Sequence, residues 1–215
     1  YLYGGSNELG DVNNTNVYIE DGTAYYVFGG NNLGGTVSKT KVTTTGGTIK
    51  QEIYGGGNEV ATTNTYLYLS GGNILDAYGG GRSADVDETY VEATNDVTNI
   101  YGGSNTDGSV PITNLKIISG SFKNIYGGNN LGGTVIETKI NIVNGTIDNI
   151  YGGGNEVETN KTNITINAGS IINIYGGGNK AQVSSTSTNI LDGTIANLFG
   201  GGNEGYTGFS EVLIN

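Results

Sequence analysis

Apolar and polar residues alternate in short segments along the chain. In "TNITINAG", which begins at Thr162, the isoleucines Ile164 and Ile166 are separated by polar residues. A period of two is typical of a β-strand with one buried face, so the isoleucines are predicted to point inward. Glycine ends the segment, and a second apolar segment follows in the form "GTIDNIYGG", here from Gly145. The pattern therefore predicts short strands separated by glycine-containing turns.

This pattern is repeated at a nearly constant interval. An aromatic residue followed by glycines recurs every 23 to 26 residues, at Tyr3, Phe28, Tyr54, Tyr78, Tyr101, Tyr126, Tyr151, Tyr175 and Phe199. A threonine column lies between them, at Thr15, Thr40, Thr65, Thr89, Thr113, Thr138, Thr162 and Thr186. Seven residues after each threonine comes a glycine, with Asp96 as the exception, and valine precedes six of the eight threonines by three residues. Self-similarity at this period indicates a repeat architecture.

The repeat predicts an all-β fold, a parallel β-helix (β-solenoid) of about nine coils with 24 to 25 residues each. We expect three short strands per coil: one around the valine, one after the threonine and one before the aromatic residue. The aromatic residues would stack on each other one strand spacing apart, ~4.8 Å, and burial as an internal stack is favoured for nine large rings. The glycines after them would turn the backbone with positive φ at a crowded corner.

Asparagine also recurs at fixed places relative to the aromatic residue. One set lies two residues before it, at Asn99, Asn124, Asn149, Asn173 and Asn197. Another follows the glycines, at Asn7, Asn58, Asn105, Asn155, Asn179 and Asn203. Stacked amides can hydrogen-bond to each other along the axis, so both sets are predicted to form asparagine ladders.

A longer period of four coils is superimposed on the shorter one. "FGGNNLGGTVSKTKV" from Phe28 matches "YGGNNLGGTVIETKI" from Tyr126, and "YGGGNEVATTNT" matches "YGGGNEVETNKT". We expect one solenoid domain over 1–215, built from four-coil units at about 3–100 and 101–198 with a partial third unit at 199–215. Neither end shows a cap for the terminal strands, which predicts contact with further coils of the same chain or of an adjacent one.

Composition excludes several functions. The formal net charge is −11 and no basic cluster exists, which argues against nucleic-acid binding. The chain has no cysteine or histidine, so thiolate and imidazole metal sites and a histidine general base are excluded. No apolar stretch approaches the ~18 residues of a membrane helix, and we expect no transmembrane segment.

One acidic cluster could take part in chemistry. "SADVDET" contains Asp85, Asp87 and Glu88, whose oxygen atoms could bind calcium. The competing interpretation is a solvated acidic loop, and no other cofactor is expected. Pectate-lyase-like enzymes share the predicted architecture, but their sites are clusters of acidic and basic residues on one sheet. No such cluster is evident, so we expect a protein that is not an enzyme.

Outward strand positions provide a second candidate site. Tyr18, Tyr66, Tyr68 and Tyr90 occupy such positions, and the last three should lie close together on adjacent coils. Exposed aromatic residues can stack on sugar faces or dock a protein, while the alternative is cross-strand packing that only stabilises the sheet.

The "NIYGGGN" corners and "TNITI" strands resemble repeats in bacterial and archaeal surface proteins of the parallel β-helix type, such as adhesins and autotransporter passengers. The resemblance implies an extracellular or cell-surface location. Together with the repeat it favours a structural or adhesive segment of a surface fibre or stalk, a rigid spacer whose chains could associate end to end. The alternatives are a glycan-binding module that uses the outward tyrosines to bind surface glycans, and a polysaccharide-active β-helix enzyme.

Overall fold

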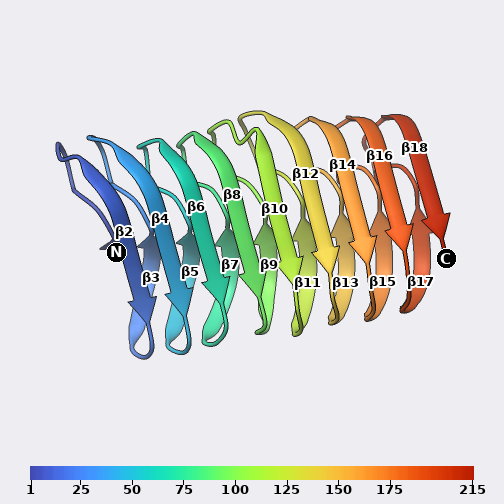
Figure 1. The fold of residues 1–215 in the computed structure, drawn as a ribbon, viewed down its shortest axis with the longest axis horizontal. Coiled ribbons are helices and arrows are strands. Elements are labelled where there is room, and N and C mark those ends of the chain that lie inside the picture. Colours follow the sequence, from blue (N-terminus) through green and yellow to red (C-terminus); the bar gives the residue numbers. More distant parts are fainter.

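The computed structural model describes residues 1–215 and contains eighteen β-strands and no helix. They form two nine-stranded sheets in which all neighbours are parallel (Figure 1). Sheet A contains β1 (Leu2–Tyr3), β3 (Thr23–Phe28), β5 (Thr48–Tyr54), β7 (Asn73–Tyr78), β9 (Val97–Tyr101), β11 (Ser121–Tyr126), β13 (Thr146–Tyr151), β15 (Ser170–Tyr175) and β17 (Thr194–Phe199). Sheet B contains β2 (Val12–Ile19), β4 (Val37–Thr44), β6 (Thr62–Leu69), β8 (Val86–Ala93), β10 (Ile112–Ile117), β12 (Val135–Ile142), β14 (Thr159–Ile166), β16 (Val183–Ile190) and β18 (Thr207–Ile214). The predicted β-solenoid of about nine coils is confirmed.

Each coil has two strands, so the prediction of three was wrong. Val135, expected in a strand of its own, is the first residue of β12, which also contains Thr138. The side chains of Val135 and Thr138 are buried, whereas the two residues between them are not. Within β12, only Ile136 is not paired with β14. The strand therefore bends after the valine and continues in the same sheet. Two successive outward residues interrupt the period of two, and such an interruption has the same sequence pattern as a boundary between two strands.

The main hydrophobic core lies between the two sheets. Its 27 buried residues are almost all valine, leucine, isoleucine or alanine, such as Ile140 and Ile142 of β12 and Ile147 and Ile150 of β13. Both sheets also run without a break across residue 100, because β9 pairs with β7 and β11 in sheet A and β10 pairs with β8 and β12 in sheet B. One continuous core therefore extends along the solenoid.

The threonine column connects the two sheets across this core. Each of its eight hydroxyls donates a hydrogen bond of 2.5 to 2.7 Å to the carbonyl of the glycine that follows the next aromatic residue. Thr113, for example, donates to Gly127. No backbone N–H donates to that carbonyl, because the ladder uses the carbonyls of Tyr126 and Gly128 on either side of it. Threonine thus satisfies a buried acceptor that the sheet leaves free.

The repeated aromatic residues form one stacked column. Successive ring centroids are 4.6 to 5.1 Å apart, with interplanar angles of at most 14°. The six from Phe28 to Tyr151 are buried, and burial raises the pKa of Tyr126 to about 12. The stacking prediction is confirmed.

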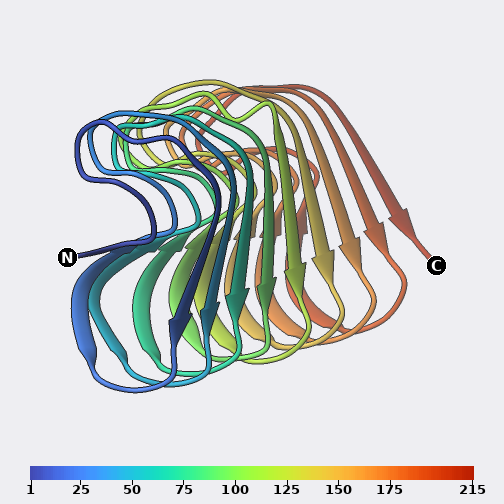
Figure 2. The same ribbon diagram turned by 60° about the vertical axis from the view of Figure 1, so that its left-hand side comes forward.

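The position of this column differs from the expected internal stack. Tyr126 follows the inward-facing Ile125, so by alternation its ring lies on the outer face of sheet A, apart from the main core. The connections from sheet A to sheet B bulge out on this side, at the upper left of Figure 2. In one of them, Nδ2 of Asn105 donates to the Tyr54 hydroxyl at 2.8 Å. The loops thus bury an aromatic column outside the space between the sheets.

Glycine is required after the aromatic residues because there is no space for a side chain. The prediction that these glycines have positive φ was wrong. A Cβ on Gly127 would lie 2.1 Å from the carbonyl oxygen of Gly152 in the next coil, and none of these glycines has positive φ. Positive φ, from 76° to 144°, occurs instead at the glycines seven residues after the threonines, Gly22, Gly47, Gly72, Gly120, Gly145, Gly169 and Gly193, and at the loop glycines Gly35, Gly108 and Gly133.

Both predicted asparagine ladders are confirmed. Asn99, Asn124, Asn149, Asn173 and Asn197 are joined by amide hydrogen bonds of 2.8 to 3.0 Å. The loop ladder contains bonds of 2.8 to 2.9 Å, passes also through Asn32 and Asn130, and is interrupted at Arg82. No helix long and apolar enough to span a membrane is present.

Candidate ligand-binding groove

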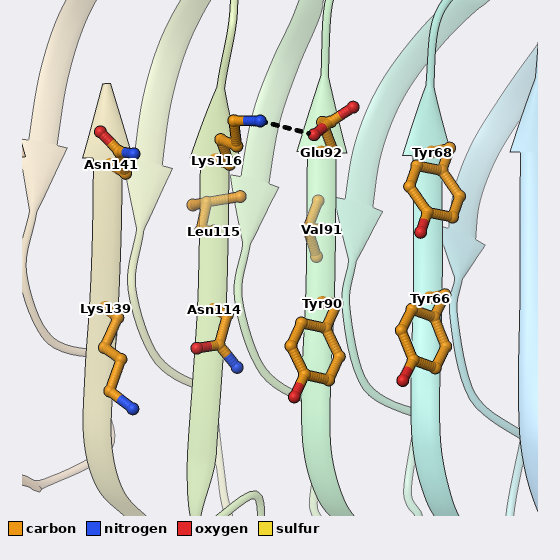
Figure 3. A pocket seen from close by; sticks show the side chains of 10 residues that line it. All are labelled: Tyr66, Tyr68, Tyr90, Val91, Glu92, Asn114, Leu115, Lys116, Lys139 and Asn141. Carbon is orange, nitrogen blue, oxygen red and sulfur yellow. Dashed lines mark hydrogen bonds and ion pairs between the residues drawn. The ribbon is translucent and has the colours of Figure 1, made fainter. Parts of the chain in front are cut away.

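A shallow groove of about 300 Å³ crosses the outer face of sheet B over β6, β8, β10 and β12 (Figure 3). It runs across the strands and therefore along the solenoid axis, over three strand spacings or ~14 Å. Its lining residues are Tyr66, Tyr68, Tyr90, Val91, Glu92, Asn114, Leu115, Lys116, Lys139 and Asn141.

Two rows of outward side chains form the walls of the groove. Strand register places Tyr66, Tyr90, Asn114 and Lys139 in the first row, and Tyr68, Glu92, Lys116 and Asn141 in the second. The inward-facing Val91 and Leu115 lie between the rows, as Figure 3 shows, so their strands contribute the floor. The alternation of the strands thus places eight side chains around one hollow.

The tyrosine rings differ in which faces are covered. Tyr66 lies between the Lys39 ammonium, 4.5 Å from its ring centroid, and the Tyr90 ring, which is stacked at 4.9 Å and 6°. Lys41 lies over one side of Tyr68, at 5.2 Å. No other ring or cation lies over the second face of Tyr90 or of Tyr68, and both residues are partly exposed. We refer to these second faces as the open ring faces.

The surroundings of Tyr90 make its phenol a weaker acid than an ordinary tyrosine. Hydrogen bonding with the carboxylate of Glu88, together with burial, raises the pKa of the Tyr90 phenol to about 12. The Asn114 Nδ2 donates to Glu88 and to the carbonyl of Thr89, both at 3.0 Å. The Nδ2 of Asn114 thus points toward β8, and its Oδ1, on the opposite side in Figure 3, has no hydrogen-bond partner in the protein.

The charged groups of the groove are paired with each other or with neighbours. Lys116 contacts Glu92 at 3.0 Å, and Lys139 contacts Glu137 at 3.5 Å. The Asn141 Oδ1 accepts a hydrogen bond from Asn167, while its Nδ2 has no partner in the protein. The groove therefore offers open ring faces, one free amide acceptor and one free amide donor, without an unpaired charge.

The structure brings together three of the four tyrosines singled out from the sequence. Tyr66, Tyr68 and Tyr90 line the groove, as expected from their positions on adjacent coils. Tyr18 does not join them, because Thr43 of β4 separates it from Tyr68 in the same row of the sheet. Its side chain is 61% exposed and lies beside a different, smaller hollow near β1.

The other lining residues were missed in the sequence, although a signal was present. All eight residues of the two rows lie one or three positions after a threonine of the column, here Thr65, Thr89, Thr113 and Thr138. Aligning the coils on that threonine would have placed Glu92, Lys116 and the two asparagines next to the tyrosines. Outward aromatic residues alone do not mark the positions of these polar groups.

The acidic residues predicted to bind calcium do not form a cluster. Asp85 accepts a hydrogen bond from the Ser109 N–H at 2.7 Å, Asp87 is exposed, and Glu88 is engaged by Asn114. The structure contains no group of three or more His, Cys, Asp or Glu side chains that could hold a metal ion. Calcium binding here stays a prediction, without a preformed ligand set.

Comparisons with protein-family models, curated proteins and solved structures found no match to this chain.

Proposed function

We propose that this chain is a structural segment of an extracellular surface fibre or stalk, in which the stacked coils act as a rigid spacer. The observation that supports this most directly is the unbroken pairing of both sheets from the first coil to the last. Shortening or sharply bending such a rod would require hydrogen bonds to break in both sheets. Eight strand spacings along the axis give a length of ~40 Å.

The last coil supports association with further coils. Strand β18 pairs only with β16, so its other edge has unpaired backbone groups. Val212 and Ile214, which continue the inward columns of sheet B, are 41% and 69% exposed, and Phe199 is 46% exposed. An apolar strand edge of this kind is a template for another strand, and we propose that it receives a coil of the same type.

Electron microscopy with light scattering on the purified chain, at increasing concentration, tests this proposal. We expect rods of uniform width that lengthen with concentration, and a Val212→Glu variant that stays short because a charge would be buried at the junction. Round or branched particles, or equal lengthening of the variant, would contradict end-to-end stacking. Antibody labelling of intact cells separately tests the proposed surface location.

The groove favours glycan binding as a second function. Tyrosine rings beside amide groups are suited to sugars, which present apolar C–H faces and hydroxyl groups. The one carboxylate that lines the groove, Glu92, is held by Lys116, which supports a binding role and not an acid–base role. Such a segment would be both spacer and adhesive.

A further inference from the structure

We propose that the groove binds a neutral oligosaccharide, laid along the solenoid axis, by stacking of sugar rings on Tyr68 and Tyr90. This inference rests on the second function proposed above and is independent of the spacer function. It assigns the ligand class, its direction and the residues that contact it.

The direction of the ligand follows from the shape of the groove. The two open ring faces belong to adjacent strands, β6 and β8, and the groove continues over β10 and β12 to Lys139 and Asn141. A linear chain of sugars can cover the rings at one end and reach the amides further along. The Asn114 Oδ1 and the Asn141 Nδ2 can then accept and donate hydrogen bonds to hydroxyl groups.

The absence of an unpaired charge in the groove favours a neutral ligand. An anionic sugar would have to take Lys116 from Glu92 or Lys139 from Glu137. It would also approach a chain whose formal net charge is −11. A neutral sugar can form hydrogen bonds with these paired groups while the ion pairs stay intact.

The position of the groove also favours a sugar over a peptide. An extended peptide can bind a sheet by adding a strand to an exposed edge, whereas a proline-rich peptide can dock on aromatic side chains. Here β6, β8, β10 and β12 each pair on both sides, so the backbone of the groove floor has no free edge. Side chains alone must therefore supply the contacts, as they do in stacking on sugars.

Isothermal titration calorimetry on the full chain tests the inference, with cellohexaose, mannohexaose and chitohexaose as neutral probes, hexagalacturonate as the anionic probe and decaproline as a peptide probe. We expect at least one neutral hexasaccharide to bind. Tyr90→Ala should weaken it at least about 10-fold, whereas Tyr90→Phe should retain it because the stacking ring remains. Tyr18→Ala is the matched control, an exposed tyrosine of the same sheet outside the groove, and should leave the affinity unchanged. Thermal melts verify that each variant is folded.

Three outcomes would overturn the inference. Binding of hexagalacturonate alone would contradict the neutral class while glycan binding itself would stand. Binding of decaproline alone would indicate a protein partner. The absence of binding by any probe, or neutral-sugar binding that Tyr90→Ala does not weaken, would overturn both the inference and the second proposed function.

Discussion

Thr159 and Thr162 are both buried in β14, but only one of their hydroxyls has a partner. Thr162 belongs to the threonine column and donates to the Gly176 carbonyl at 2.6 Å. Thr159 occupies the place that valine has in most coils, and its hydroxyl has no hydrogen-bond partner. A buried acceptor left unpaired costs about 1–3 kcal/mol, whereas removal of an unpaired hydroxyl costs nothing.

We therefore predict opposite effects for the same substitution at these two positions. Thr162→Val should lower the free energy of unfolding by about 1–3 kcal/mol, because it leaves the Gly176 carbonyl without a donor. Thr159→Val should leave the free energy of unfolding unchanged or raise it by up to about 1 kcal/mol. Urea unfolding of both variants measures the difference. Equal effects would show that the threonine column is maintained for its shape alone.

Asp76 occupies a position that asparagine has in later coils. Its Oδ1 accepts a hydrogen bond from the Asn99 Nδ2 at 2.7 Å, and its strand neighbour is Glu52. Burial raises the pKa of the Asp76 carboxyl, and the charge of Glu52 adds to this shift, while the Asn99 hydrogen bond opposes it. Since the folded state favours the protonated acid, stability present at low pH is lost as the pH rises through the folded pKa.

Asp76→Asn should therefore stabilise the protein at neutral pH. The new amide keeps the bond from Asn99 and can donate to Glu52, which extends the asparagine ladder. Because the side chain is partly exposed, we expect a gain of only about 1 kcal/mol, or 2–4 °C in Tm. Thermal melts from pH 7 to pH 3 measure the difference in Tm between the variant and the original protein. This difference should shrink as the pH falls and the Asp76 carboxyl becomes protonated. A Tm that is unchanged at pH 7, or a gain that persists undiminished at pH 3, would contradict this account.

At the scale of strands and turns, glycine has two separate roles in all coils but the one with Asp96. Gly127 follows an aromatic residue and leaves no space for a Cβ, because backbone atoms of the next coil lie 2.1 Å from that position. Gly22 ends a sheet B segment with a φ of 86° and has nothing within 4 Å of its Cβ position. The first role is steric and the second is conformational.

Alanine substitutions separate these roles. Gly127→Ala should destabilise the protein by at least ~3 kcal/mol, because two coils held by ladder hydrogen bonds must move apart. Gly22→Ala should cost only about 1–2 kcal/mol, the cost of left-handed backbone for an ordinary residue. Chemical denaturation of the two variants provides the comparison. A larger loss of stability for Gly22→Ala than for Gly127→Ala would mean that the need for positive φ constrains the sequence of the coils more than close packing does.

The sequence predicted the repeat-level features well. Period-two alternation identified the inward residues such as Ile164 and Ile166, and column spacing identified the stacked rings and the amide ladders. Features that depend on a single extra outward residue were not predictable in this way. Alternation alone predicts a strand boundary after Val135, because it cannot distinguish a bent strand from two strands.

The location of the aromatic column and the composition of the groove were also beyond the sequence argument. The column lies outside the main core because each aromatic residue directly follows an inward residue, and because the connecting loops turn back over it. Burial by loops cannot be read from a strand pattern. The outward tyrosines were predicted, but which of their faces Lys39 and Lys41 cover follows only from side-chain geometry.

In the whole molecule, coils add along one axis at constant cross-section. The sequence divides into units of four coils, and residues 101–198 form one predicted unit. If the solenoid is a rigid rod, a second copy of this unit inserted after Leu198 joins in register, since Phe199 and Tyr101 occupy equivalent places in the stack. The insertion then adds four strand spacings to the length.

Small-angle X-ray scattering of the original and the lengthened protein, under dilute conditions, is the most direct test. For a rigid rod, we expect the maximum dimension to increase by ~19 Å, four spacings of ~4.8 Å, while the radius of gyration of the cross-section stays the same. An unchanged length with a thicker cross-section, or scattering typical of a flexible chain, would contradict the rigid stack of coils.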